Sequence, residues 1–268
     1  MTIEVLEPHG FCAGVRGAID VALSLSGKVY CLHELVHNEL VVAELEKRGF
    51  SFVEDVDEIP DGETVLFSAH GVSPATREAA AKRLKIVDAT CPFVARVHRD
   101  ARAFAEAGLP VVIIGNADHA EVRGIVGETG GKAYIYPDLP EGRRIGIVSQ
   151  TTMNADEVAR IVGELEKKYE VVSTAQVCGA TKERQDAVKN FDGDALLVLG
   201  SANSSNTRRL CEAAKCRVFR AGSMDEVRAI DFSGIGRLGI TGGASTPESF
   251  LVEATEFLKQ PDNYRKDN

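Results

Sequence analysis

The sequence predicts an α/β protein made of three similar lobes, each with a small, mostly parallel four-stranded sheet. Two observations lead to this fold class. Short apolar segments of strand length alternate with amphipathic segments of helix length along the chain, which is typical of parallel sheets covered by helices. The same order of elements occurs three times, and each repeat is headed by a cysteine between a strand and a helix: Cys12, Cys91 and Cys178. Cysteines roughly 80 to 90 residues apart indicate a repeated small domain rather than a solenoid unit.

The composition is that of a globular chain, with 44% hydrophobic and 26% charged residues over 268 positions. The formal net charge of -9 argues against broad binding to nucleic acids or anionic membranes, which favours an excess of Lys and Arg. No apolar run approaches the ~20 residues of a transmembrane helix, and the first residues do not resemble a signal peptide. We therefore expect a cytoplasmic protein with no nucleic-acid or membrane partner. Its six cysteines are then expected as thiols, metal ligands or catalysts rather than disulfides.

The first lobe is expected over residues 1–85. Four apolar runs predict its strands: Ile3–Leu6, Val29–Leu32, Ser51–Val53 and Thr64–Phe67. Amphipathic stretches predict its helices: Ala13–Leu25, Glu39–Arg48 and Pro74–Leu84. The third of these can open at its proline, because proline suits the first turn of a helix.

The second and third lobes, expected over residues 86–169 and 170–259, repeat this order. In the second lobe the strands are predicted at Ile86–Val87, Val111–Ile114, Ala133–Tyr136 and Ile145–Val148, and two helices at Phe93–Ala107 and Ala155–Lys168. In the third lobe the strands are predicted at Val171–Val172, Leu196–Leu199, Arg217–Phe219 and Leu238–Thr241. The polar tail, residues 260–268, is expected to be peripheral or frayed.

The repeated cysteines indicate a metal centre at the carboxyl ends of the strands, where ligands of parallel sheets bind. If a pseudo-threefold axis relates the lobes, the three cysteine loops converge on one central cavity. A single cysteine at a strand end is as often a small buried hydrophobe, but three in equivalent positions favour thiolate ligation of zinc or of an iron-sulfur cluster. Three protein ligands leave one coordination position open. Cys31, Cys211 and Cys216 fall within or next to predicted elements and are expected to be core residues.

Polar loops follow other predicted strands and indicate an anion pocket. Imidazoles, hydroxyls, amides and helix N-termini can bind phosphate oxygens without an excess of basic residues. The residues concerned are His37, His70, His119, Ser204, Ser205, Asn206 and Ser245. Glu121 is an acid in such a loop, so it either caps the following helix or moves protons.

Nine segments together resemble the 4-hydroxy-3-methylbut-2-enyl diphosphate reductase family. They are His9-Gly10-Phe11-Cys12-Ala13-Gly14-Val15, Val36-His37-Asn38, Ser68-Ala69-His70-Gly71, Asp88-Ala89-Thr90-Cys91-Pro92, His119-Ala120-Glu121-Val122, Gln150-Thr151-Thr152, Cys178-Gly179-Ala180-Thr181, Asn203-Ser204-Ser205-Asn206 and Gly243-Ala244-Ser245-Thr246-Pro247. The resemblance spans nearly the whole chain, and the segments occur in the family's order. It implies a trefoil of three α/β domains around a 4Fe-4S cluster, one iron of which has no cysteine ligand.

The resemblance also implies a role for each site residue. Cys12, Cys91 and Cys178 would be the cluster ligands, and the seven residues of the anion pocket would bind a diphosphate. Glu121 would be the proton source, and Thr151 would lie beside the substrate hydroxyl. The reaction implied is reductive dehydroxylation of an allylic diphosphate, the last step of the methylerythritol phosphate route, with electrons from an external low-potential donor such as ferredoxin or flavodoxin.

Two other functions fit part of this pattern. A redox-neutral 4Fe-4S dehydratase, or an enzyme resembling quinolinate synthase, would also use three cysteines and one open iron. A non-catalytic iron-sulfur sensor would need the cluster but neither Glu121 nor the diphosphate pocket. An assay with substrate and a strong reductant separates all three.

Overall fold

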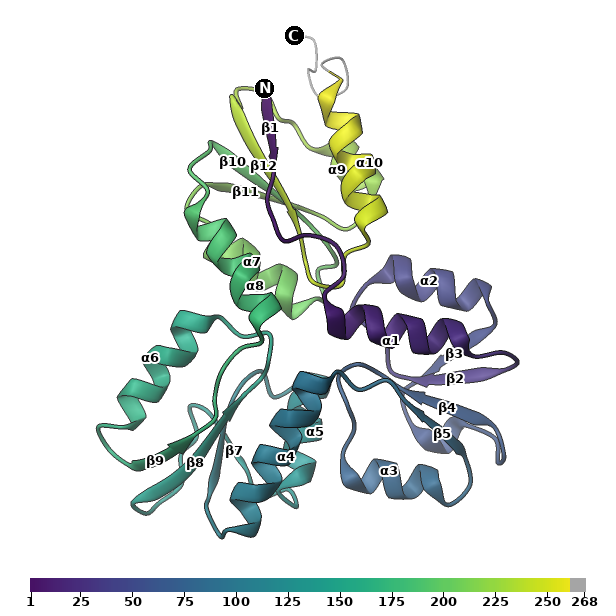
Figure 1. The fold of residues 1–268 in the computed structure, drawn as a ribbon, viewed down its shortest axis with the longest axis vertical. Coiled ribbons are helices and arrows are strands. Elements are labelled where there is room, and N and C mark those ends of the chain that lie inside the picture. The colour runs from purple at the N-terminus through teal and green to yellow at the C-terminus, as the bar shows by residue number, and fades with distance from the viewer. Residues whose placement is uncertain (261–268) are drawn as a thin grey trace. The chain divides into compact units, whose positions relative to one another are not determined.

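The computed structural model describes residues 1–260 and consists of parallel sheets covered by helices (Figure 1). In this part of the chain there are three sheets of four strands each, and every strand pair is parallel. The predicted fold class is therefore confirmed. All of the predicted tail except Gln260 lies outside the described residues. No helix among residues 1–260 combines the length and the apolar character that a membrane span requires.

The chain divides into two compact units, and each is described by itself. The first unit comprises residues 1–12, residues 37–41 and the chain from Gly179 onward. Its sheet has the order β1-β12-β10-β11, with β1 at Thr2–Val5, β10 at Ala195–Leu199, β11 at Arg217–Ala221 and β12 at Arg237–Gly242. Its helices are α7 at Gly179–Asn190, α8 at Ser205–Ala213, α9 at Met224–Ala229 and α10 at Glu248–Lys259.

Alternation along β10 explains why helices cover both faces of this sheet. Successive strand residues point to opposite faces, and all five residues of β10 are buried. Leu197 and Leu199 pack with α9 and α10, whereas Leu196 and Val198 pack with α7 and α8 (Figure 1). The continuous apolar run of β10 therefore belongs to a strand that is buried on both faces of the sheet.

The second unit comprises residues 13–36 and 42–178 and holds the other two sheets. One has the order β3-β2-β4-β5, with β2 at Val29–Leu32, β3 at Phe50–Val53, β4 at Thr64–Phe67 and β5 at Lys85–Asp88. Its helical segments are α1 at Ala13–Ser24, α2 at Glu39–Lys47, the 3-10 turn η1 at Val56–Glu58 and α3 at Pro74–Ala81. The first residues of α2 belong to the first unit.

The remaining sheet of the second unit has the order β7-β6-β8-β9. Its strands are β6 at Val111–Ile114, β7 at Tyr134–Ile135, β8 at Arg144–Ser149 and β9 at Glu170–Ser173. Its helices are α4 at Pro92–Glu106, α5 at Ala120–Glu128 and α6 at Ala155–Leu165. Val112 and Ile114 pack with α6, and Val111 and Ile113 face α4 and α5 on the other side (Figure 1).

Three strands pair in a different sheet from the one expected. The sequence placed the strand before each cysteine in the lobe that the cysteine heads, but β1 pairs with β12, β5 with β4 and β9 with β8. β5 and β9 are thus edge strands that pair with the last central strand of the preceding repeat. β1 is also an edge strand, but it pairs with β12 from the final repeat of the chain. Apolar periodicity identifies a strand but does not select its hydrogen-bonding neighbour. The expected boundary between the first and second lobes, at residues 85 and 86, falls inside β5. The other lobe boundaries stay a prediction.

Candidate active site

The three repeated cysteines have the same backbone environment. The N–H of Cys12 donates to the carbonyl of Ala244, that of Cys91 to Ala69 and that of Cys178 to Thr151, at 3.0 Å in each case. The strand before each cysteine pairs with a second strand, and the accepting carbonyl lies just after that second strand. The second strand is β12 for Cys12, β4 for Cys91 and β8 for Cys178. The repeat seen in the sequence is therefore a repeat of hydrogen-bonded structure.

Each of these cysteines also stands at the start of a helix. Cys91 is the N-cap of α4, and Pro92 is its first residue, while Cys12 and Cys178 directly precede α1 and α7. All three side chains are partly exposed. In the second unit, a Cβ atom on Gly14 would lie 2.4 Å from the Sγ of Cys91, so only glycine fits beside this sulfur.

The other three cysteines have more apolar surroundings. Cys31 is buried, as expected for a core residue, whereas Cys211 and Cys216 are only partly buried. Cys31 is fully buried in β2, and burial raises the pKa of its thiol to about 12. Cys211 and Cys216 pack against an apolar cluster, and burial raises the pKa of both thiols. A thiol with a raised pKa is a poor thiolate ligand. No disulfide links any of the six within the described residues.

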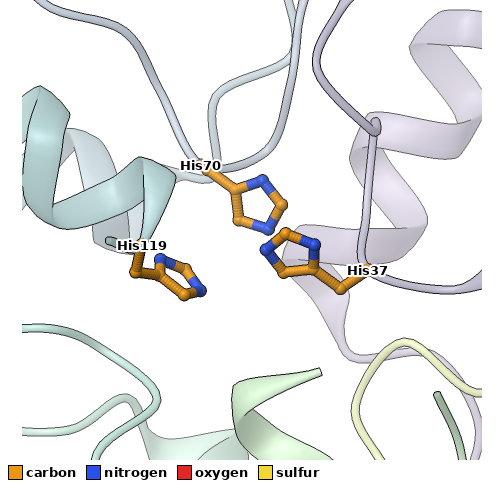
Figure 2. Close-up of side chains that lie close together, drawn as sticks. All are labelled: His37, His70 and His119. Carbon is orange, nitrogen blue, oxygen red and sulfur yellow. The ribbon is translucent and has the colours of Figure 1, made fainter. Parts of the chain in front are cut away.

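Two of the predicted histidines meet in the second unit. The rings of His70, in the loop after β4, and His119, before α5, lie 5.4 Å apart in an edge-to-face arrangement (Figure 2). The Oγ of Ser68 is 3.3 Å from Nδ1 of His70. His119 is the N-cap of α5, and its Nδ1 accepts the N–H of Glu121 at 3.2 Å. When the His119 ring is neutral, this hydrogen bond places its proton on Nε2.

Glu121 is a buried acid rather than a helix cap. The capping alternative is wrong because His119 occupies that position. The Glu121 side chain points away to Thr151, which donates its N–H to Oε1 at 2.7 Å and its hydroxyl to Oε2 at 3.1 Å. Glu121 is 1% exposed. Burial raises its pKa to about 7, although the two hydrogen bonds from Thr151 act in the opposite direction. A carboxyl with such a pKa can be protonated near neutral pH.

The hydroxyl and amide residues of the anion pocket gather in the first unit. Ser204 is the N-cap of α8, accepting the N–H of Thr207 at 3.3 Å, and Ser205 and Asn206 form the first turn. The Oγ of Ser245 donates to the carbonyl of His37 at 3.1 Å. Asn206 is 4% exposed, and within the described part of the chain neither atom of its amide has a hydrogen-bond partner. A buried polar group without a partner is costly, so this amide indicates a ligand site.

Arg184 was not predicted from the sequence. It lies in α7 and is 3% exposed. Its guanidinium donates to the carbonyls of Ala180 at 3.0 Å and Gly10 at 2.8 Å. It thereby connects the loop before Cys12 to the first turn after Cys178, within the first unit. An arginine in the second turn of a helix that follows a candidate ligand is a weak signal in the sequence, because arginines at such positions are mostly exposed.

Comparison with known proteins decides the family. The family model described as LytB protein matches residues 3–259. The chain belongs to the LytB family. The match includes every cysteine, histidine, serine, asparagine, glutamate and threonine of the candidate site described above.

Curated LytB relatives are similar over nearly the whole chain. "4-Hydroxy-3-methylbut-2-enyl diphosphate reductase 2" of Burkholderia mallei is 41% identical over 279 aligned residues, covering 96% of this chain and 86% of that protein. The reductase of Psychrobacter arcticus is 39% identical, covering 97% of this chain and 89% of that protein.

Two solved structures share the fold. The structure of the E-1-hydroxy-2-methyl-but-2-enyl-4-diphosphate reductase from Plasmodium falciparum matches with a TM-score of 0.90 and 30% identity, covering 98% of this chain and 90% of that one. A structure described as (E)-4-hydroxy-3-methyl-but-2-enyl diphosphate reductase, the terminal enzyme of the non-mevalonate pathway, matches with a TM-score of 0.68 and 32% identity. It covers 97% of this chain and 99% of that one.

Proposed function

We propose that this protein is a 4-hydroxy-3-methylbut-2-enyl diphosphate reductase. It would convert (E)-4-hydroxy-3-methylbut-2-enyl diphosphate, two electrons and two protons into water and either isopentenyl or dimethylallyl diphosphate, the last step of non-mevalonate isoprenoid precursor synthesis. The observation that carries this proposal is that relatives named 4-hydroxy-3-methylbut-2-enyl diphosphate reductase align with nearly the whole chain at about 40% identity. The buried acid beside Thr151 and the unpartnered amide of Asn206 support it.

Cys12, Cys91 and Cys178 are proposed as the three protein ligands of a 4Fe-4S cluster. The residues fit this cofactor because they share one backbone environment at helix starts and remain partly exposed. Cys31, Cys211 and Cys216 have raised pKa values and apolar neighbours. When bound, the cluster supplies an iron without a cysteine ligand, which acts as a Lewis acid, and a route for two electrons.

The diphosphate is proposed to bind donors that carry little net charge. The set is His37, His70, His119, Ser204, Ser205, Asn206 and Ser245. His119 and Ser204 cap α5 and α8, whose N-termini add backbone donors and a favourable dipole for an anion. The Nδ2 of Asn206, which has no hydrogen-bond partner among residues 1–260, can donate to a phosphate oxygen. Such a site suits an acidic protein that has to bind an anion locally.

Glu121 is proposed as the acid, and Thr151 as the group that holds the substrate hydroxyl. Burial keeps the pKa of Glu121 near 7, so its carboxyl can deliver a proton at neutral pH and become ionised. The hydroxyl of Thr151 is 3.1 Å from Oε2, so it can accept the proton of the protonated Glu121 while it donates its own proton to the leaving hydroxyl. The substrate hydroxyl then departs as water.

The proposed partners follow from this reaction. The small-molecule partner is the allylic diphosphate, and the electrons come from an external low-potential carrier such as ferredoxin or flavodoxin. We propose a cytoplasmic location and no nucleic-acid or membrane partner, because the chain has a negative net charge and no long apolar run.

An anaerobic assay with reconstituted protein, a strong low-potential reductant and (E)-4-hydroxy-3-methylbut-2-enyl diphosphate tests the proposal. We expect the two isoprenyl diphosphates and consumption of two electrons per product. Formation of a dehydrated product without consumption of reductant would indicate a dehydratase. Cluster reduction with no change in the substrate would indicate a sensor.

A further inference from the structure

His98 is a buried polar residue of the second unit to which neither the sequence nor the proposed mechanism gives a role. It lies in α4 and is 6% exposed, on the face that also buries Val94, Val97 and Ala101. The edge of its ring fits between two glycines. A Cβ atom on Gly124 would lie 2.8 Å from Cε1 of His98, and one on Gly71 would lie 3.1 Å from the same atom.

These two glycines belong to segments that carry proposed site residues. Gly71 directly follows His70, and it has a left-handed backbone with φ of 74°. Gly124 lies in α5, the helix capped by His119 and containing Glu121. The His98 ring therefore contacts the loop of one diphosphate binder and the helix of another, and its own helix starts at a proposed cluster ligand.

A buried carboxylate fixes the orientation of the ring. Nδ1 of His98 is 3.1 Å from Oε1 of Glu128, whose side chain is 5% exposed. Arg102 donates to Oε2 of the same carboxylate through Nε at 2.8 Å and Nη2 at 2.6 Å. Nδ1 is thus the donor to Glu128, and Nε2 faces the glycines and has no hydrogen-bond partner among the residues that the structure describes. Burial lowers the pKa of His98, which agrees with a neutral ring.

We propose that His98 is a positioning residue, which sets the distance between the His70 loop and α5 so that His70, His119 and Glu121 face the substrate together. This inference rests on the proposed function. Simple filling of the core would not need a polar ring or glycines on both sides. Gly124 weakens the interior of α5 by about 1 kcal/mol relative to alanine, but the ring occupies the space that the alanine methyl group would need.

A pair of substitutions tests whether the ring and Gly124 act together. Gly124→Ala places a methyl group where the ring lies, so we expect binding of inorganic diphosphate, measured by calorimetry, to weaken about tenfold or more, with a similar fall in kcat/KM. His98→Ala removes the spacer and should have a similar effect. In the double variant the methyl group occupies the vacated space, so the two losses should not add, and thermal stability should partly recover.

Two further variants separate positioning from general stability. His98→Gln keeps a donor for Glu128 and should recover most of the affinity for diphosphate. Phe104→Leu, at the other end of α4 where Phe104 packs on Gly146, should lower the melting temperature and leave diphosphate binding and KM unchanged. The iron content of all variants should equal that of the wild type.

Several results would overturn the inference. One is that Gly124→Ala binds diphosphate as tightly as the wild type. A second is that the losses of diphosphate affinity in the two single variants add in the double variant. A third is that His98→Ala and Phe104→Leu have the same diphosphate affinity and KM. Iron loss from His98→Ala with unchanged diphosphate binding would do so as well, because it would assign the ring to support of Cys91. A wild-type protein that binds diphosphate but does not reduce the substrate would refute the proposed function alone, since the stability and binding measurements do not depend on turnover.

Discussion

Thr151 makes two hydrogen bonds to one buried carboxylate, donating its backbone N–H to Oε1 of Glu121 and its hydroxyl to Oε2. The pair joins the loop after β8 to the first turn of α5. It places a proton donor and a hydroxyl next to each other in a site with almost no solvent access to the acid. This arrangement makes Glu121 testable both as a catalyst and as a titrating group.

Glu121→Gln should lose on the order of a hundredfold or more in turnover while keeping its iron-sulfur spectrum and substrate affinity. Glutamine keeps the shape and can still accept from Thr151, but it cannot deliver a proton. In the wild type, kcat/KM should fall as the pH rises above about 7, because the free enzyme then loses the proton of Glu121. A glutamine variant with near-normal turnover across the pH range would place proton delivery elsewhere.

The same carboxyl should make the folding stability depend on pH. Its pKa is raised from 4.5 to about 7 in the folded state, so the folded protein binds more protons than the unfolded chain between these values. Stability should therefore fall as the pH rises through this window, by at most on the order of 3 kcal/mol. Urea unfolding at pH 5 and pH 8 should show this loss in the wild type but not in Glu121→Gln. Parallel pH dependence in both proteins would contradict it.

The cysteine assignment predicts two classes of variant. Serine at Cys12, Cys91 or Cys178 should remove most of the cluster, because each thiolate is a proposed ligand. Serine at Cys211 or Cys216 should leave about four irons and four sulfides per chain, with a loss of stability set by packing alone. Iron and sulfide analysis after anaerobic reconstitution measures both. Equal cluster loss from Cys211→Ser would refute the ligand set.

Two glycines of α1 provide a matched pair for the environment of Cys91. Gly14→Ala would place a methyl group 2.4 Å from Sγ of Cys91, so the sulfur must move, and we expect reduced iron content. Gly17→Ala meets no atom within 4 Å and should raise stability by up to about 1 kcal/mol through helix propensity. Equal iron content in the two variants would mean that the position of Cys91 is not restricted by α1.

Asn206 should show opposite effects on stability and binding. Both polar atoms of its buried amide lack a hydrogen-bond partner in residues 1–260, so Asn206→Leu should stabilise the ligand-free protein by about 1 kcal/mol. The same change should weaken competition by inorganic diphosphate roughly tenfold or more, because a donor to a charged oxygen is lost. Asn190→Leu, at an exposed position of α7, is the control and should leave competition unchanged. Unaltered competition in Asn206→Leu would remove this residue from the site.

The sequence by itself determined the strands, most helices, the threefold cysteine repeat and the loops that carry the candidate site. These features depend on residues close together in the chain: apolar runs for strands, 3.6-residue periodicity for helices, and proline or capping residues at helix starts. Thr64–Phe67 was predicted with the bounds that β4 has. Cys91 was expected between a strand and a helix, and it is the N-cap of α4.

Only the tertiary structure decided which strands pair and which polar groups are buried. β1 pairs with β12 from the opposite end of the chain, and nothing local to either strand distinguishes that partner from another parallel strand. The ambiguity of Glu121 between cap and acid was likewise resolved by Thr151, thirty residues away. Strand pairing and desolvation are set by contacts distant in sequence, and local patterns do not encode them.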